Sequence, residues 1–316
     1  MTAETGDYNR SMLQDAGLVT PAFDRPLVSI VIGSYNRRRF LEQAIESIRA
    51  NGARSSHEQI VVDGGSTDGS LDWLVRQKDV ITIVQHNRGD FRGTPVQRRS
   101  WGYFMNLGFK AAQGKFILMI SDDCLLVPGA IDRGVERFKE LEARGRRVGG
   151  LAFYYRNWPN EQEYYVQRTF GGKLMVNHGL FERSAFEAVG WVDEDRYQFY
   201  KADGDVCLKM WQAGFVIEDC PGAFVEHFES ANRAVRKSNR ELLARDREAY
   251  RQRWEGVFWE SEGPELRDRL GVRYDDPHHT AQRFPSDEPG LVERMRWSAR
   301  RTSERALSWI VSSVPV

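Results

Sequence analysis

The residues best suited to chemistry are two adjacent carboxylates, Asp122 and Asp123, which follow an apolar run at 116–120. A continuous apolar run opened by Gly114 is typical of a strand buried on both faces of a parallel sheet. Ligands of such sheets bind beyond the carboxyl ends of the strands, where these two acids fall. Adjacent like charges need a compensating partner, and Mg²⁺ with phosphate ligands supplies one. The pair therefore indicates a site for a cation and a phosphorylated ligand, with a solvated acidic turn as the alternative.

Two earlier strand-like segments also end in polar residues. Gly33-Ser34-Tyr35-Asn36 ends the first, and Asp63 with a glycine-rich loop ends the second. Because parallel strands bring their carboxyl ends to one edge of a sheet, we expect these tips to share a crevice with Asp122 and Asp123. There Tyr35 could stack on a base, and Asp63 could accept a hydrogen bond from a base N–H or a ribose hydroxyl. The loop matches neither a Walker A sequence nor GxGxxG, which excludes ATPases and dinucleotide enzymes.

The elements that position these tips alternate between strand and helix patterns from residue 27 onward. This alternation favours a parallel, Rossmann-like sheet as far as residue 123. After about residue 150 the pattern changes, and 163–170 is predicted to be a polar edge strand. The strands expected are 28–32, 59–62, 80–84, 116–120, 148–155, 163–170, 179–181 and 215–217. The longer helices expected are 100–113, 203–213 and 230–254.

The order and spacing of these segments resemble the family 2 glycosyltransferases, and the resemblance covers about residues 27 to 255. It implies an α/β GT-A fold, with a Rossmann-like, mainly parallel sheet flanked by helices and a helical C-terminal extension. The matching pieces are VSIVIGSYNR (28–37), IVVDGGSTDGS (60–70), NLGFKAAQGKFILMISDDCLLVPGAI (106–131), GLFERSAFEAVGWVDED (179–195), ADGDVCLKMWQAGF (202–215) and GAFVEH (222–227).

The resemblance implies a donor site for a nucleotide-sugar and a metal site beside it. The divalent cation, Mn²⁺ or Mg²⁺, would be held by Asp123 and His227 and would neutralise charge on the leaving diphosphate. Arg99 would be a second cationic contact to the donor, with a solvated residue of an arginine-rich loop as the alternative. The nucleotide-sugar contacts implied are Gly33, Tyr35, Asp63, Arg99 and, at the ribose, Asp122.

On the acceptor side, the resemblance implies that Asp203 is the general base that deprotonates the acceptor hydroxyl. The family usually has a glutamate where this chain has Ala202, so the role falls on Asp203. Acceptor contacts are expected from Asn177, His178 and Asp205. For Asp205, the alternative is an acid in the first turn of a helix that complements the helix dipole.

These residues together predict a metal-dependent, inverting enzyme that moves one sugar, with a UDP-sugar as the expected donor and GDP- and dTDP-sugars left open. The acceptor would be a glycan, a lipid-linked or a small molecule. The sequence has no QxxRW motif, so processive polymer synthesis is not expected. Two alternatives remain: a non-catalytic nucleotide-sugar or glycan-binding protein, suggested by Ala202, and a sugar-1-phosphate nucleotidyltransferase, whose basic loop after the first strand is missing.

Composition limits the setting in which this chemistry would occur. The formal net charge is zero, which gives no reason to expect a nucleic-acid partner. Three cysteines without metal-ligand spacing are expected to be reduced thiols, and no apolar stretch reaches the roughly 20 residues that span a bilayer. We therefore expect a cytoplasmic protein. Its predicted parts are a lead-in (1–26), a catalytic domain (27–228, with a nucleotide-binding half 27–123 and an acceptor half 124–228) and a helical extension (229–316).

The segment 291–310 combines an apolar helical stripe with five arginines. One interpretation is an amphipathic helix that makes a peripheral contact with the inner face of an anionic membrane. The other is a helix packed on the catalytic domain or on a second subunit of a homo-oligomer. The sequence leaves both open.

Overall fold

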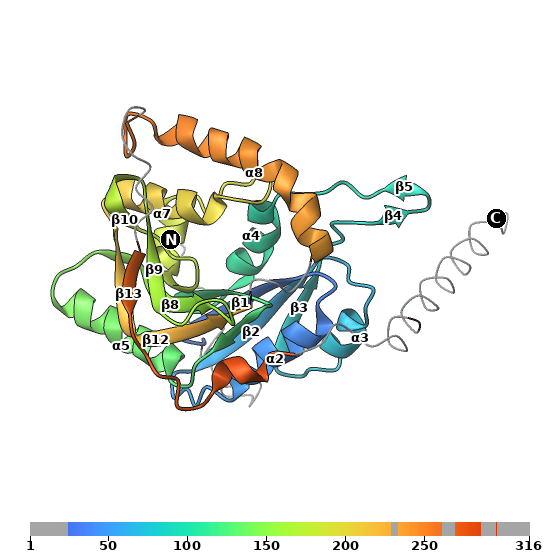
Figure 1. The fold of residues 1–316 in the computed structure, drawn as a ribbon, viewed down its shortest axis with the longest axis horizontal. Coiled ribbons are helices and arrows are strands. Elements are labelled where there is room, and N and C mark those ends of the chain that lie inside the picture. Colours follow the sequence, from blue (N-terminus) through green and yellow to red (C-terminus); the bar gives the residue numbers. More distant parts are fainter. Residues whose placement is uncertain (1–24, 229–232, 261–268, 286–294, 296–316) are drawn as a thin grey trace, which may run out of the picture.

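Residues 25–228, 233–260, 269–285 and 295 are described in the structure, a computed structural model, and they form a β-sheet with helices on both faces (Figure 1). The parallel half of the sheet has the strand order β3-β2-β1-β6. The register pairs Ser34 with Asp63 and Gly33 with Ser121, so the strands end at one edge, as the polar tips predict. The strands are β1 (Val28–Ser34), β2 (His57–Asp63), β3 (Val80–Val84) and β6 (Phe116–Ser121).

The other half of the sheet is mixed. Strand β11 lies antiparallel between β6 and β8, and β12 runs parallel to β8 and antiparallel to β7. This arrangement brings the ends of β7 and β12 beside the tips of the parallel half. The strands are β7 (Cys124–Leu126), β8 (Val148–Asn157), β9 (Tyr164–Thr169), β10 (Lys173–Leu174), β11 (Gly179–Glu182) and β12 (Val216–His227).

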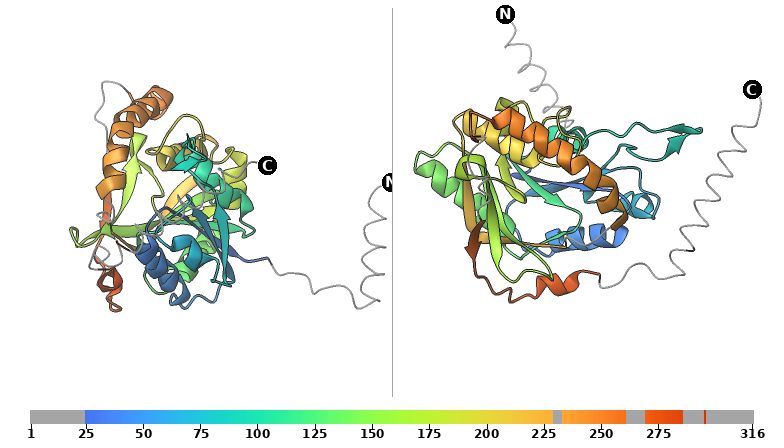
Figure 2. Two further views of the ribbon diagram at one scale, coloured as in Figure 1. Left: turned by 90° about the vertical axis from the view of Figure 1, so that its right-hand side faces the viewer. Right: turned by 45° about the horizontal axis from the view of Figure 1, so that its top comes forward.

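Helices cover both faces because alternate side chains of each strand point to opposite sides. On β1, Ile30 belongs to the hydrophobic cluster under α2 and α5, whereas Val31 belongs to the cluster under α4, α6, α7 and α8. Figure 2 shows α2 and α8 on opposite sides of the sheet. The helices are α2 (Arg38–Arg49), α3 (Ser70–Leu74), α4 (Trp101–Ala111), α5 (Ala130–Ala143), α6 (Arg183–Ala188), α7 (Ala202–Gln212) and α8 (Arg233–Trp254).

Strand β9 differs from the wet edge strand that its sequence predicts. Its residues Tyr164, Tyr165 and Val166 are buried, because β13 (Arg269–Val272) pairs antiparallel with β9. The ring of Tyr274, just after β13, packs edge-on against Tyr164 at 5.7 Å. A strand of the C-terminal part thus completes the sheet. The prediction failed because the polarity of β9 was judged without its partner, which is only four residues long.

The remaining described elements are short. They are the hairpin β4 (Asp90–Phe91) and β5 (Thr94–Pro95), which projects from the body in Figure 1, and the 3₁₀ turns η1 (Phe170–Gly172) and η2 (Thr280–Arg283). All three cysteines are buried and free of disulfides. No helix among the described residues is long and apolar enough to cross a membrane. The predicted amphipathic helix at 291–310, apart from Met295, and residues 1–24 of the lead-in lie outside the described residues. The domain division stays a prediction.

Candidate active site

A cavity of about 430 Å³ lies at the edge where β1 and β6 end, and we call it the donor cavity. It collects six of the predicted residues, from four separate segments of the chain. The residues of the prediction that line it are Gly33, Tyr35, Arg99, Asp122, Asp123 and His227. Its other lining residues include Arg37, Arg88, Arg98, Phe199 and Tyr200. The cavity therefore combines aromatic rings and cations with two carboxylates, which suits a ligand with a flat base and phosphates.

The carboxylates of Asp122 and Asp123 are bridged by Arg37, a residue that the sequence reasoning missed. Its Nη1 lies 2.7 Å from Asp122 Oδ1, and its Nη2 lies 2.9 Å from Asp123 Oδ2. The hydroxyl of Ser34 also donates to Asp122, at 2.9 Å. Arg37 occupies the N-cap position of α2, which directly follows the tip of β1. In the sequence, the one sign that Arg37 belongs to the site is that it directly follows the polar segment 33–36.

Burial and the charge of Arg37 act in opposite directions on the two acids. Burial raises the pKa of Asp122 to about 6, although Arg37 opposes the rise. Burial also opposes ionisation of Asp123, but the charges of Arg37 and His227 outweigh it, and the pKa of Asp123 is lowered. Asp123 is therefore an anion at neutral pH, as a metal ligand must be.

Asp123 and His227 present donor atoms that fit a divalent cation. The Oδ1 atom of Asp123 is buried without a hydrogen-bond partner, and Nε2 of His227 lies 3.7 Å from it. Nδ1 of His227 donates a hydrogen bond to Oδ1 of Asn157 at 2.7 Å, which orients the ring with Nε2 toward the carboxylate. Such outer-shell hydrogen bonds commonly orient histidine ligands. An unpartnered oxygen opposite an oriented nitrogen is suitable for Mn²⁺ or Mg²⁺.

Cys124 and His178 pack behind His227. Cys124 lies directly opposite His227 in the β7–β12 pair, and ligand atoms of these three residues lie within 4.8 Å of one another. The sulfur of Cys124 is 3.6 Å and 3.7 Å from the two nitrogens of His178, so it lies along neither nitrogen lone pair. Burial lowers the pKa of His178 to about 3 and raises that of the Cys124 thiol, so both are neutral. They support His227 rather than forming a ready-made chelate.

Asp63 is close to the donor cavity but does not line it. Its Oδ1 accepts hydrogen bonds from the backbone N–H groups of Gly65 and Ser66, at 2.8 Å and 2.7 Å, and its Oδ2 accepts from the Ser66 hydroxyl at 2.7 Å. Burial raises the pKa of Asp63. The carboxylate thus fixes the loop after β2. Gly64 of this loop does line the cavity, and a Cβ there would lie 3.0 Å from the ring of Tyr35.

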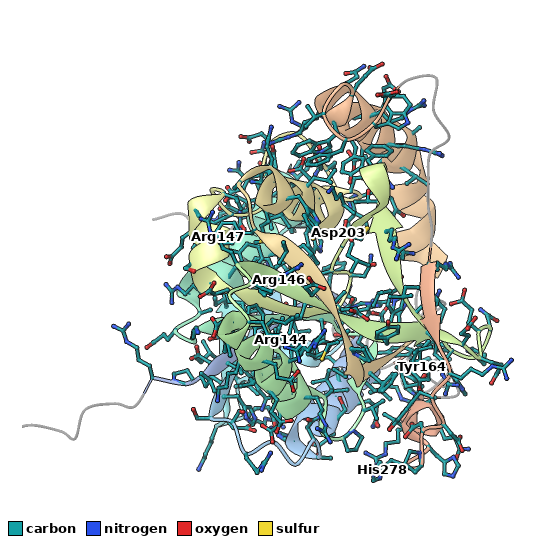
Figure 3. The ribbon with its side chains drawn as sticks, turned by 90° about the vertical axis from the view of Figure 1, so that its left-hand side faces the viewer. Arg144, Arg146, Arg147, Tyr164, Asp203 and His278 are labelled. Atoms are coloured by element: carbon teal, nitrogen blue, oxygen red, sulfur yellow. The ribbon has the colours of Figure 1, made fainter. Side chains whose placement is uncertain are left out.

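The predicted base Asp203 lies away from the donor cavity, in the wall of two further cavities. The middle cavity, about 660 Å³, shares Gly33, Ser121, Tyr200 and His227 with the donor cavity. The outer cavity, about 500 Å³, shares Asn177, Tyr200 and Asp203 with the middle one. The three adjoin one another, and Figure 3 shows Asp203 at the start of α7, on the side facing β9. His178 lines the middle cavity.

Asp203 is placed by the first turn of α7. Its Oδ1 accepts a hydrogen bond from the N–H of Gly204 at 2.8 Å, and its Oδ2 accepts one from the Asn177 amide at 3.3 Å. Burial raises the pKa of Asp203. A carboxylate with a raised pKa and an open side toward a cavity can accept a proton from a bound hydroxyl.

Asp205 does not line any of the three cavities. It accepts hydrogen bonds from the Tyr197 hydroxyl at 2.8 Å and from Trp254 Nε1 at 3.0 Å, and Arg253 Nε lies 3.1 Å away. In this structure Asp205 ties α7 to the end of α8. The sequence could not separate this role from acceptor binding, because its partners come from distant segments.

Asp246 of α8 is a second residue that the sequence reasoning missed. Its buried carboxylate accepts hydrogen bonds from three consecutive backbone N–H groups, those of Gln198 at 2.9 Å, Phe199 at 2.8 Å and Tyr200 at 2.8 Å. These residues form a wall of the donor cavity. Nothing in the sequence distinguishes Asp246 from its neighbours in a highly charged helix, so no local signal could have found it.

The model of the family described as glycosyl transferase family 2 matches residues 29–193. An uncharacterized protein of Sinorhizobium fredii is 25% identical over an alignment 272 residues long, which covers 74% of this chain and 28% of that protein. The GalNAc(5)-diNAcBac-PP-undecaprenol β-1,3-glucosyltransferase of Campylobacter jejuni is 28% identical over 162 residues, covering 51% of this chain and 47% of that enzyme. In both cases the chain spans less than half of the relative's length.

Among solved structures, the fold is similar to that of a mannosyltransferase from Pyrobaculum calidifontis in complex with GDP-Man and Mn²⁺. The TM-score is 0.51 at 15% sequence identity, and the similarity covers 98% of this chain and 84% of that protein. It confirms the α/β, Rossmann-like GT-A fold that the sequence predicts.

Proposed function

The chain belongs to glycosyl transferase family 2, and from this premise we propose that it moves one sugar from a nucleotide-sugar donor to an acceptor hydroxyl in glycan biosynthesis. The observation that carries the proposal is the arrangement of the three cavities. Asp123 and His227 border the donor cavity, Asp203 borders the middle cavity, and the two cavities share His227 and Tyr200. We infer that a leaving group in the donor cavity and the base Asp203 would lie on either side of one reacting carbon.

The donor cavity suits a nucleoside diphosphate sugar, and a UDP-sugar is our first choice. Tyr35, with Arg88 positioned 5.4 Å from its ring centroid, offers a surface for the base. Asp122 would accept a hydrogen bond from the ribose, and the cations Arg98 and Arg99 line the same cavity where the diphosphate would lie. The complex of the similar mannosyltransferase with GDP-Man and Mn²⁺ supports a nucleotide-sugar and a divalent cation as the ligand pair.

Asp123 and His227 would hold the divalent cation, Mn²⁺ or Mg²⁺. When bound, the cation supplies Lewis-acid neutralisation of the charge that develops on the departing diphosphate. The protein's share is to keep Asp123 ionised through Arg37 and to orient the ring of His227 through Asn157. The Arg37–Asp123 ion pair and the His227–Asn157 hydrogen bond are both formed without a ligand. The two side chains therefore need little rearrangement when a ligand binds.

Asp203 would act as the general base. It accepts the proton of the acceptor hydroxyl while that oxygen forms the new bond to the anomeric carbon and the bond from this carbon to the diphosphate oxygen breaks. The attack comes from the face opposite the leaving group, so the anomeric configuration inverts. The raised pKa of Asp203 favours this role, because a base works best with a pKa near the working pH.

The acceptor would bind in the middle and outer cavities. The Campylobacter relative is named for a glycan on undecaprenyl diphosphate, which supports a lipid-linked acceptor as one class. The size of the middle and outer cavities admits a sugar of a glycan or a small molecule equally well.

The proposal is tested by nucleoside diphosphate release from UDP-, GDP- and dTDP-sugars, with and without Mn²⁺ or Mg²⁺. We expect slow, metal-dependent release from one donor, and its loss in an Asp123→Ala variant. Asp72→Asn, an exposed acid of α3 outside all three cavities, is the matched control and should behave as the wild type. If no donor of the panel binds in the presence of metal, the proposal is wrong. Binding without transfer to any acceptor would instead favour a non-catalytic binding protein.

A further inference from the structure

The end of β12 is covered by a C-terminal strap, which we define as residues 269–284. The strap begins with β13 and ends with η2 and Phe284, and Figure 1 shows it running from the edge of the sheet to α2. Tyr274 stacks on Phe224 of β12, with the ring centroids 3.8 Å apart and the ring planes at 11°. At the other end of the strap, Phe284 packs on Phe228 at 5.3 Å. The strap is therefore anchored on both sides of the last residues of β12.

Phe284 belongs to an aromatic cluster that the proposed reaction does not explain. Its buried ring lies 5.9 Å from that of Trp158, in a stacked arrangement, and 6.4 Å from that of Phe40. Phe40 and Phe228 also stack on each other, at 5.4 Å. These separations are typical of aromatic pairs that attract one another. Because the three partner rings come from α2, from the residue after β8 and from the residue after β12, Phe284 joins segments that are far apart in the sequence.

Two of the partner rings are direct neighbours of residues at the proposed metal site. Phe228 follows His227, and Trp158 follows Asn157, whose amide oxygen accepts the hydrogen bond from His227. Backbone hydrogen bonds join the same segments. The N–H of Trp158 donates to the carbonyl of His227, and the N–H of Phe228 donates to the carbonyl of Asp123, both at 2.9 Å. A shift of either ring would therefore move the backbone that carries the metal site.

The third partner ring belongs to α2, the helix that begins after Arg37. Phe40 lies one helical turn after Arg37, and the guanidinium carbon of Arg37 is 6.0 Å from the centre of its ring. The same guanidinium pairs with Asp122 and Asp123. None of the four rings of the cluster lines the donor cavity. They can affect a ligand there only through the residues to which they are joined.

We propose that Phe284 is a positioning residue of the metal site, which holds the start of α2 and the ends of β8 and β12 at the separation that cation binding needs. This inference rests on the proposed function, because it takes Asp123 and His227 as the residues that hold the cation. Closely packed rings suit the role, since a packed interior resists displacement. Loss of the Phe284 ring would leave a cavity into which the three segments can relax.

The test measures Mn²⁺ binding to the full chain by electron paramagnetic resonance. In Phe284→Ala we expect the dissociation constant for Mn²⁺ to rise about threefold to tenfold, less than when an outer-shell partner of a ligand is itself removed. Phe284→Leu keeps most of the apolar volume, so it should show a smaller rise in the same direction. It also provides the measurement if Phe284→Ala does not fold.

Trp259→Leu is the matched control for a purely structural effect. Trp259 is another buried ring of the C-terminal part, and it stacks on Phe170 at 5.6 Å, outside the cluster. Urea unfolding should show lower stability in Trp259→Leu and in the Phe284 variants alike. Only the Phe284 variants should bind Mn²⁺ more weakly, because only their ring is joined to the metal site.

Two results would overturn the inference. One is wild-type Mn²⁺ affinity in a folded Phe284 variant, which would leave the ring with a structural role alone. The other is an equal loss of affinity in Trp259→Leu, because the effect would then follow from lower stability. Failure of the proposed metal site has a separate signature, which is a wild type that binds no Mn²⁺ or a His227→Ala variant with undiminished affinity. The inference about Phe284 would fall with that site.

Discussion

The guanidinium of Arg37 lies 2.7 Å from the carboxylate of Asp122 and is the counterion of both donor-site acids in the absence of ligand. Without it, two buried neighbouring carboxylates would not both ionise near neutral pH. Arg37 thereby links the N-cap position of α2 to the two acids that follow β6.

Replacement of Arg37 by glutamine should raise the pKa of both acids, because it removes their shared cation. The acid limb of metal-dependent nucleotide-sugar binding should then move to higher pH, because the proposed cation site needs ionised Asp123. Binding titrations between pH 5 and 8 would measure the shift. Arg38→Gln, the next residue, whose partner is Glu42 on the helix surface, serves as control. An unchanged pH profile in Arg37→Gln would contradict the assigned role.

Removal of the Asn157 amide should weaken Mn²⁺ binding about 10- to 100-fold, as is typical when a histidine ligand loses its outer-shell partner. The reason is that Asn157 accepts the hydrogen bond that orients the ring of His227. Mn²⁺ titration monitored by electron paramagnetic resonance would compare Asn157→Ala with His227→Ala, which should lose more. His57→Ala, at the start of β2, should bind Mn²⁺ as the wild type does. Wild-type affinity in His227→Ala would remove His227 from the metal site.

Acid should destabilise the protein through His178. Its pKa is lowered to about 3 in the folded state, against about 6.5 for an unfolded chain, so the unfolded chain binds the proton more tightly. The contribution of His178 to the free energy of unfolding is fully present above pH 6.5 and is lost as the pH falls toward 3. Between pH 7 and 5 the free energy of unfolding should fall by about 2 kcal/mol. Urea unfolding at both pH values should show this loss. In His178→Gln the difference between the two pH values should shrink; if it persists in full, His178 is not its source.

Asp246 should hold in place the wall of the donor cavity that residues 198–200 form. Asp246→Ala leaves three backbone N–H groups without their acceptor, at a cost of about 1–3 kcal/mol for each group that stays buried. We expect lower thermal stability together with weaker donor binding, because Phe199 and Tyr200 line the cavity. Glu248→Gln, an exposed position on the same helix, is the matched control. Lower stability with unchanged donor affinity would limit Asp246 to a structural role.

The parts of the site that the sequence could predict are those encoded in short segments. The tips of β1 and β6 follow apolar runs, and the parallel register then brings Tyr35, Asp122 and Asp123 together without further information. The expectation that Asp123 and His227 share a metal came from the family resemblance and stays a prediction; Nε2 of His227 lies 3.7 Å from Oδ1 of Asp123.

The parts that could not be predicted depend on partners far away in the chain. Asp246 holds a loop almost 50 positions earlier, and β13 changes β9 from an edge strand into a buried one. Asp63 has the residue type and place of a base contact, yet its carboxylate turns into its own loop. Local patterns identify which residues are polar, but hydrogen-bond partners decide where each side chain points.

The most direct test of the account is Asp203→Asn, measured for sugar transfer and for metal-dependent donor binding in the same preparation. The variant keeps the size of the side chain and removes the base. We predict a loss of transfer of about 10²- to 10⁴-fold, with donor affinity within about twofold of the wild type. Transfer at the wild-type rate would contradict the account, because the base would then be another group.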